Sequence, residues 1–165
     1  IGRLDWDSEG LILLTNDGEF ANKVMHPSKE VTKTYHVKLD GQPQPYQIKK
    51  LLTGVSIPGG RVRAKHVEKL KLSKAKTAKS SDKKVWYKII ITEGKNHQVR
   101  EMFKKIGFDV VKLQRVAIGK LRLGQLDRGA MVYLNEAALE RVFMQDLATE
   151  NSGGDVSTDL SRLKK

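Results

Sequence analysis

Two β-strand signals constrain the fold of this chain more than any other feature of its sequence. Residues 85–92 (VWYKIIIT) are rich in β-branched and aromatic side chains, which favour a pleated, half-buried surface. Residues 31–39 (VTKTYHVKL) alternate, so that Lys33 and Tyr35 share one side of the strand with three aliphatic residues. This mixture predicts a strand that runs from the hydrophobic core into a functional site.

Other segments carry strand and helix signals that alternate along the chain. Strands are expected at residues 11–14, 55–57, 61–72, 108–118 and 131–134. Helices are expected at residues 19–25, between Pro43 and Gly54, from Asn96 to Ile106, and from Asn135 to Leu147. The elements interleave without the strict rhythm of parallel βαβ units. The sequence therefore predicts an α+β fold with a mainly antiparallel, mixed sheet and flanking helices.

The charge balance indicates a polyanionic partner. Lys and Arg total 31 against 19 Asp and Glu, a net charge of +12 at pH 7. A surface of this kind binds nucleic acid well, because neutralised phosphates release their condensed counterions. A soluble protein with a basic surface is the plain alternative, and no basic amphipathic helix supports binding to an anionic membrane. Residues 73–84 (SKAKTAKSSDKK) have no large apolar side chain and predict a mobile loop.

Length and composition predict one domain followed by a tail. The 165 residues suffice for a single domain, which we expect at residues 1–148, with residues 149–165 as a disordered tail. The chain contains no cysteine, which excludes disulfides and thiolate metal sites and suits a reducing, cytoplasmic setting. Because the chain starts at Ile1, directly on the first motif below, we expect an N-terminal part of the domain to precede it.

Polar residues that suit an active site gather in three separate segments. They are Arg3, Asp5, Asp7 and Glu9 in an opening loop, Tyr35 in a strand, and His97, Gln98 and Arg100 at a helix start. The opening loop lies directly before the apolar run 11–14, and a loop beside a core strand is a rigid mount for chemistry. Taken singly, each segment also has an ordinary structural interpretation as a turn, as packing or as surface charge.

Three motifs in this order resemble those of pseudouridine synthases that modify ribosomal RNA. The first is GRLD at residues 2–5, followed by DSEGL at 7–11 and closed by TNDG at 15–18. The second is the Lys-x-Tyr pattern within residues 31–37, and the third is TEGKNHQVREMF at residues 92–103. The resemblance is to the family typified by RsuA, RluB, RluE and RluF, and it runs from Gly2 to about Leu134. A single GRLD would not be specific, whereas three motifs in order are.

The resemblance implies an isomerase that converts a specific uridine in ribosomal RNA to pseudouridine. In this family the Asp of GRLD, here Asp5, is the nucleophile. The matching Tyr35 lies in the active site, and the matching Arg100 pairs with Asp5. Arg3 matches the Arg that fills the space of the extruded nucleotide. Further RNA contacts are expected from Lys33, Lys95, His97, Gln98 and Arg115.

Several alternatives remain open at this point. The opening motif looks like the large-subunit group and His97 is closer to the small-subunit type, so a 23S target is favoured over a 16S target. A basic RNA-binding module without catalysis is the alternative from another class. A metal loop of Asp5, Asp7 and Glu9 is a weaker interpretation, because the spacing lacks the remaining ligands of a calcium loop. We expect a monomer that acts on RNA in the cytoplasm, without a cofactor, a metal or a membrane.

Overall fold

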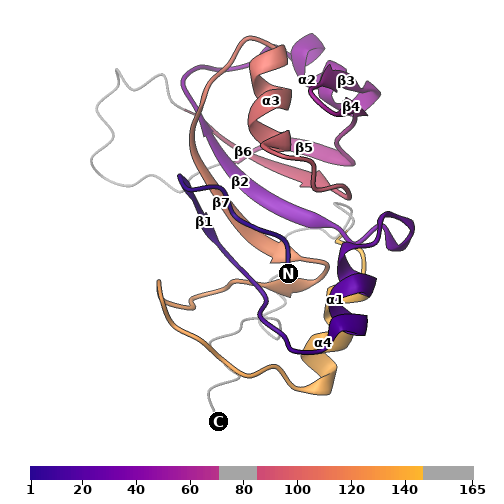
Figure 1. The fold of residues 1–165 in the computed structure, drawn as a ribbon. Coiled ribbons are helices and arrows are strands. Elements are labelled where there is room, and N and C mark those ends of the chain that lie inside the picture. Colours follow the sequence, from indigo (N-terminus) through magenta and orange to yellow (C-terminus); the bar gives the residue numbers. More distant parts are fainter. Residues whose placement is uncertain (71–84, 147–165) are drawn as a thin grey trace.

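The computed structural model describes residues 1–70 and 85–146, and its main element is a six-stranded sheet (Figure 1). The strands are β1 (Ser8–Gly10), β2 (Lys33–Leu39), β5 (His66–Lys69), β6 (Val85–Ile91), β7 (Val110–Ile118) and β8 (Leu121–Arg122). Their order is β1-β7-β2-β6-β5, and β8 pairs with β7. β1 runs parallel to β7, and the other pairs are antiparallel. This confirms the predicted α+β fold with a mainly antiparallel, mixed sheet.

Helices and a small hairpin flank the sheet at its two ends. The helices of the described residues are α1 (Gly18–Met25), the 3-10 turn η1 (Pro27–Lys29), α2 (Pro45–Thr53), α3 (Gln98–Lys105) and α4 (Glu136–Phe143). The hairpin consists of β3 (Val55–Ile57) and β4 (Gly60–Val62). Figure 1 shows α2, α3 and the hairpin at one end of the sheet and α1 and α4 at the other. The long strands β2 and β7 therefore connect two groups of helices.

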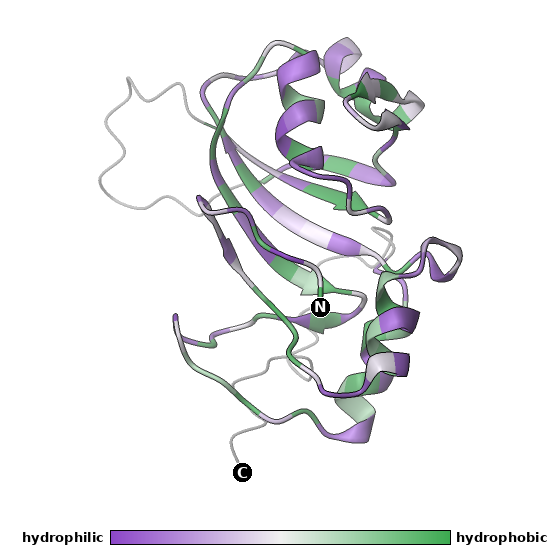
Figure 2. Cartoon of the chain, viewed as in Figure 1, coloured by the Kyte–Doolittle hydropathy of each residue, from purple (hydrophilic) through white to green (hydrophobic). Residues whose placement is uncertain are grey.

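Helix α3 covers one face of the sheet through side chains at the predicted spacing. Val99, Met102, Phe103 and Ile106 are at most 5% exposed, and they share one hydrophobic cluster with β2 and β6. Residues at i, i+3, i+4 and i+7 lie on the same side of a helix. Figure 2 accordingly shows hydrophobic and hydrophilic bands along α3. Gly107, with a φ of 90°, follows the helix and ends it.

A second hydrophobic cluster joins α1, α4 and the chain that follows β1. Val24 of α1 and Val142 of α4 are buried together with Leu11 and Leu13. The start of α4 is capped as predicted, because the Asn135 side chain accepts a hydrogen bond from the backbone N–H of residue 138 at 2.9 Å. The segment after β1 is thus anchored in a core of its own, which gives the preceding loop a fixed base.

The opening strand lies earlier than predicted. β1 spans Ser8–Gly10, and residues 11–14 are not a strand. The Leu11 carbonyl instead accepts a hydrogen bond from Nε of Arg115, at 2.7 Å. A side chain therefore takes the place of a strand partner at this carbonyl, and the ladder with β7 stops there. The apolar run still supplies Leu11 and Leu13 to the second core.

Two other predicted strands differ from the structure. Within residues 61–70, the described part of the predicted strand 61–72, the chain divides into β4 and β5, because the Ala64 N–H donates to the Leu51 carbonyl of α2 at 2.8 Å and interrupts the strand. Residues 131–134 are not a strand; they pair with no strand of the described chain, and Tyr133 is 101% exposed. The prediction there relied on apolar side chains of which Leu134 packs against the second core, whereas Met131 and Tyr133 are exposed.

Some predictions fall outside the described residues. They are the mobile loop at residues 73–84, the domain boundary at 148 and the tail at 149–165. The last helix, predicted to reach Leu147, ends at Phe143, because Met144 adopts an extended backbone. Within residues 1–70 and 85–146, no helix has both the length and the apolar character that are needed to span a membrane.

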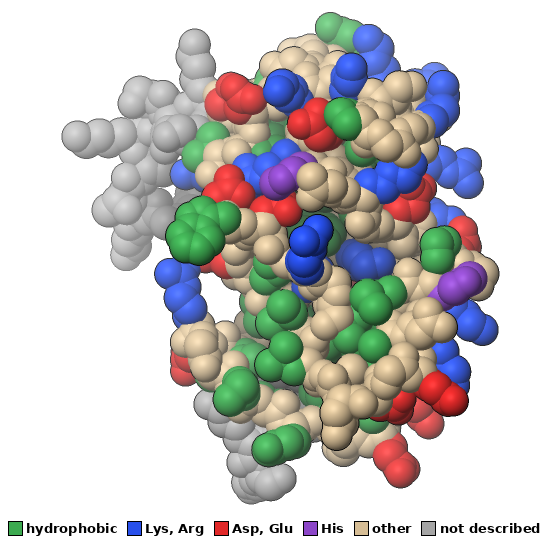
Figure 3. Space-filling model, viewed as in Figure 1, with side chains coloured by type: hydrophobic (Ala, Val, Ile, Leu, Met, Phe, Trp, Pro, Cys, Tyr) green, Lys and Arg blue, Asp and Glu red, His purple; other side chains and the backbone are tan. Residues whose placement is uncertain are grey.

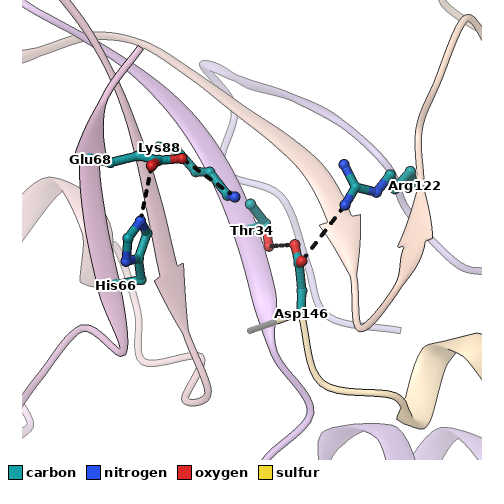
Figure 4. A network of polar contacts seen from close by, with 6 residues as sticks. All are labelled: Thr34, His66, Glu68, Lys88, Arg122 and Asp146. Carbon is teal, nitrogen blue, oxygen red and sulfur yellow. Dashed lines mark hydrogen bonds and ion pairs between the residues drawn. The ribbon is translucent and has the colours of Figure 1, made fainter. Parts of the chain in front are cut away.

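The face of the sheet opposite α3 carries a network of polar side chains (Figure 4). Alternate residues of a strand point to opposite faces, so Thr34 and His36 lie on this side while Tyr35 and Val37 face the other. The polar contacts join Thr34 with Asp146 and Arg122, and Glu68 with His66 and Lys88. Burial lowers the pKa of His36 below its ordinary value of 6.5; Lys88 lowers it further and Glu68 opposes the shift. His36 is therefore held in its neutral form more firmly than an exposed histidine.

Candidate active site

A cleft of about 370 Å³ opens where the N-terminal loop meets β2 and the start of α3. Its lining comes from segments far apart in the sequence, namely residues 2–5 with Ser8, residues 94–99 and parts of β2, β6 and β7. The site residues predicted from the sequence that line it are Arg3, Asp5, Lys33, Tyr35, Lys95, His97, Gln98 and Arg115. Arg100 is the predicted site residue that does not. In Figure 3, Lys and Arg side chains are frequent around α2, α3 and the hairpin, and Asp and Glu side chains lie among them as well as near α1 and α4.

Asp5 is held in a tight turn and faces a histidine. The Ser8 N–H donates to the Asp5 carbonyl at 2.9 Å, which closes the turn. The side chain of Asp5 is 24% exposed, and its Oδ2 lies 3.3 Å from Nδ1 of His97. The carboxylate is therefore partly shielded from water yet accessible from the cleft.

His97 occupies an unusual backbone conformation at the start of α3. It is the N-cap residue in place of the predicted Asn96, with φ 49° and ψ 23°, and its side chain makes no capping hydrogen bond. A left-handed conformation is rare for a residue with a Cβ and is typical of functional sites. Because the ring does not cap the helix, it is available to Asp5. The sequence assigned His97 to RNA contacts, and no sequence signal indicates a positive φ at this position.

The structure differs from the expected pairing of Arg100 with Asp5. Nη2 of Arg100 lies 2.9 Å from the Asp7 carboxylate and 3.3 Å from the Asp7 carbonyl, and Nη1 donates to the Val110 carbonyl at 2.9 Å. Arg100 lies within the first turn of α3 and reaches the outer side of the loop, away from the cleft. It therefore fixes the loop that carries Asp5, and His97 is the basic side chain that meets Asp5 itself.

Two buried cations lie at the inner end of the cleft. Arg115 is 2% exposed and donates from Nε to Leu11 O at 2.7 Å and from Nη2 to Gly2 O at 3.0 Å. Lys33 is 9% exposed, and its Nζ contacts two backbone carbonyls at 3.3 and 3.4 Å. Burial lowers the pKa of Lys33, and the positive charge of Arg115 lowers it further. The inner end of the cleft thus favours negative charge on a bound group.

The rest of the lining offers one ring and several polar side chains. Tyr35 is half-buried and packs against the first hydrophobic cluster, and Arg3 is exposed at the entrance. Gln98 is 3% exposed and accepts a hydrogen bond from the Lys95 N–H at 2.9 Å, so its amide fixes the loop before α3. Ser8 belongs to the first motif and lines the cleft, but no sequence signal predicts a role for it. Its buried Oγ has no hydrogen-bond partner among the described residues.

The acidic residues of the opening loop do not converge on a common point. Asp7 is turned toward Arg100, and Glu9 pairs with Lys112 at 2.9 Å and with Arg128. The hydrogen bond from Lys112 lowers the pKa of Glu9 despite an opposing effect of burial, and Arg128 adds to the lowering. Across the described parts of the chain, no three His, Cys, Asp or Glu side chains are grouped closely enough to hold a metal ion. This arrangement does not support the metal-loop interpretation.

Comparison with known proteins agrees with the motifs. The sequence profile of the family "RNA pseudouridylate synthase" matches residues 1–105. The chain is 43% identical over 129 residues to the ribosomal large subunit pseudouridine synthase B of Bacillus subtilis (strain 168), covering 78% of this chain and 50% of that protein. It is 38% identical over 135 residues to the synthase E of Xanthomonas campestris pv. campestris, covering 78% and 72%.

A solved structure shares the fold. The crystal structure of a pseudouridylate synthase aligns with a TM-score of 0.70 at 30% identity, covering 86% of this chain and 57% of that one. The chain spans about half the length of several curated relatives that it matches, including the synthase B proteins of Bacillus subtilis and Buchnera aphidicola (50% and 54%). On the family profile, the identities and this shared fold, the chain belongs to the RNA pseudouridylate synthase family.

Proposed function

We propose that the full-length protein is an RNA pseudouridine synthase that isomerises a uridine in large-subunit ribosomal RNA, with Asp5 as the nucleophile. The observation that carries this proposal is the position of Asp5. Its carboxylate sits on a closed turn in a cleft that also contains Tyr35 and His97, and two buried cations lie at the inner end of that cleft. Relatives of the chain are named as large-subunit enzymes, which supports the choice of RNA.

The reaction requires a carboxylate near C1′ of the sugar and positive charge near the uracil. The N-glycosidic bond between C1′ and N1 breaks, the uracil turns, C5 bonds to C1′, C5 loses its proton and N1 gains one. Asp5 acts at C1′, where a carboxylate attacks or stabilises the electron-poor sugar. The departing uracil carries negative charge, which Lys33 and Arg115 stabilise from the inner end of the cleft.

The remaining lining residues bind and orient the nucleotide. Tyr35 stacks on the uracil ring and assists removal of the C5 proton. A uridine in folded RNA must leave its stack to reach the cleft, and the exposed Arg3 takes the place that it vacates. Lys95 and His97 contact the RNA backbone at the entrance. Arg100 contributes through the loop, by holding Asp7.

The proposed cellular setting follows from the chemistry. Isomerisation exchanges no electrons with a second molecule, so the reaction needs no redox cofactor. We assign it to a monomer that acts on RNA in the cytoplasm, where a chain without cysteine has no disulfides to lose. Mapping of pseudouridines in ribosomal RNA from cells with and without the gene identifies the uridine and the subunit.

The substitution Asp5→Asn in the full-length protein tests the assignment. The substrate is an unmodified transcript of large-subunit ribosomal RNA with tritium at C5 of uridine, and tritium release measures isomerisation. Asp5→Asn is expected to abolish release and to leave RNA affinity nearly unchanged, because the amide keeps the shape of the side chain but cannot act as a nucleophile. Asp127→Asn is the matched control, since this exposed carboxylate does not line the cleft, and it should keep the activity. Isomerisation that survives Asp5→Asn contradicts the proposal.

A further inference from the structure

Trp6 is a fully exposed aromatic residue at the edge of the candidate active site. It lies between Asp5, which lines the cleft, and Asp7, which does not, and it is 104% exposed. An indole is the largest apolar side chain, and covering a solvent-exposed indole with a binding partner is energetically favourable. The ring does not pack in a hydrophobic core, and the reaction proposed above does not use it.

The turn that carries Trp6 is fixed on both sides. The hydrogen bond from Ser8 N to Asp5 O closes it at 2.9 Å, and Arg100 holds both the carboxylate and the carbonyl of Asp7. The backbone on which the indole is mounted is therefore restrained, although the ring is exposed. A rigid aromatic side chain loses little conformational entropy on binding, which makes it an effective contact.

We propose that Trp6 stacks on an RNA base adjacent to the target uridine, an inference that rests on the function proposed above. When a uridine swings into the cleft, the bases on both sides of it lose a stacking partner; Arg3 fills the gap against one of them, and the aromatic ring one residue from Asp5 stacks on the other. Phosphates on either side meet the cations at the entrance, Arg3 and Lys95. Every base has a π face, so this contact strengthens binding with little dependence on sequence.

The surroundings of Trp6 favour RNA over a protein partner. A protein-docking surface usually needs a continuous apolar patch. Trp6 instead stands between two carboxylates of a polar loop, and Asp7 and the nearby Glu9 are neutralised by Arg100, Lys112 and Arg128. An isolated ring among paired charges fits a polar, charged ligand that presents flat aromatic groups, as single-stranded RNA does.

Tryptophan fluorescence tests the contact directly. The full-length protein is prepared with the substitution Trp86→Phe, which removes the second tryptophan of this chain, a half-buried residue of β6. The tryptophan fluorescence of this domain then comes from Trp6. Titration with oligouridylate is expected to quench the emission, and an abasic ribose–phosphate strand of the same length should leave it unchanged. Equal quenching by both strands indicates a phosphate contact and overturns the stacking proposal. Absence of quenching by oligouridylate and by the ribosomal RNA transcript overturns it as well.

Affinity measurements separate the aromatic face from simple bulk. Trp6→Phe should keep most of the affinity for the ribosomal RNA transcript, whereas Trp6→Leu should weaken it about five- to 150-fold, the range known for single base–aromatic contacts. Tyr133→Leu removes another fully exposed ring that does not line the cleft, and should have no effect on binding. Unchanged RNA affinity of Trp6→Leu, with altered self-association or protein binding, assigns the ring to a protein interface and refutes the inference.

The outcome for Trp6 is separable from that for Asp5. In Asp5→Asn combined with Trp86→Phe, isomerisation is lost by design and quenching by RNA should persist. If the wild type forms pseudouridine but Trp6 is not quenched, only the stacking inference fails. If quenching occurs and no pseudouridine forms in the wild type, only the proposed function fails.

Discussion

The substitution Arg115→Lys probes how the loop that carries Asp5 is held in place. Arg115 is almost fully buried and donates to the carbonyls of Gly2 and Leu11, which lie on either side of that loop. A lysine keeps the positive charge but ends in one compact ammonium, which cannot reach both acceptors. The substitution therefore removes one attachment and leaves a buried carbonyl without its donor.

The expected loss of stability follows from these contacts. A hydrogen bond to a charged group contributes about 1.5–3 kcal/mol, and the space left by the missing guanidinium adds about 1 kcal/mol. The free energy of unfolding should thus fall by about 2.5–4 kcal/mol, which lowers the midpoint of urea unfolding by about 1–2 M at an m-value of about 2 kcal/mol/M. Because one end of the loop is released, Asp5 shifts, and the single-turnover rate should drop by about tenfold to a hundredfold.

Arg61→Lys is the matched control for this experiment. Arg61 is exposed and donates to the Thr53 carbonyl at 3.3 Å, so its substitution should change stability by less than about 0.5 kcal/mol. Urea unfolding followed by circular dichroism, together with tritium release, gives both quantities for each variant. If Arg115→Lys unfolds at the same urea concentration as the wild type and reacts at the same rate, the loop is not held by this side chain and the reasoning fails.

Three further changes test separate parts of the structure. Gly10→Ala should destabilise by about 2–5 kcal/mol in urea unfolding, because φ is 116° and a Cβ would lie 2.2 Å from a β7 carbonyl oxygen; Gly18→Ala, with open space around it, should be close to neutral. The pKa of His36 is lowered in the folded protein, so below pH 6.5 the unfolded chain binds a proton at this histidine more readily than the folded one. The free energy of unfolding therefore falls as the pH drops below that value. His36→Gln should reduce the difference between the urea midpoints measured at about pH 7.5 and about pH 5.5. His97→Gln should slow tritium release while the urea midpoint stays within error, since the ring is half-exposed and contacts Asp5; an unchanged rate would remove it from the site.

Local patterns predicted the framework of this fold well. The β-branched segment at 85–92 became β6, and the alternation of Lys33 and Tyr35 with aliphatic residues placed both side chains in the cleft from a core strand. The apolar residues of helix α3 lie at a spacing that puts them on one side of a helix, and this side is buried as predicted. The periodicity of apolar residues predicted an element correctly wherever burial of its apolar face, and not a hydrogen bond to a particular distant residue, determined the local structure.

Predictions failed where a distant side chain took the place of a backbone hydrogen-bond partner, and where a backbone dihedral angle set the direction of a side chain. Residues 11–14 read as a strand, but the buried guanidinium of Arg115 bonds the carbonyl at which the ladder would continue. The third motif predicted that Arg100 pairs with Asp5, but Arg100 contacts Asp7 and His97 contacts Asp5. This difference depends on the positive φ of His97, which a sequence does not display.

The meeting of Asp5 with His97 also joins the two ends of the molecule. The chain just after the Asp5 loop belongs to the core around α1 and α4, whereas His97 begins a helix of the other core. The strand β7 contributes Leu113 to one core and Ile118 to the other, so the separation of the carboxylate and the imidazole depends on how this strand holds the two cores. A substitution in either core that bends β7 would therefore change the distance between Asp5 and His97 without contacting the cleft.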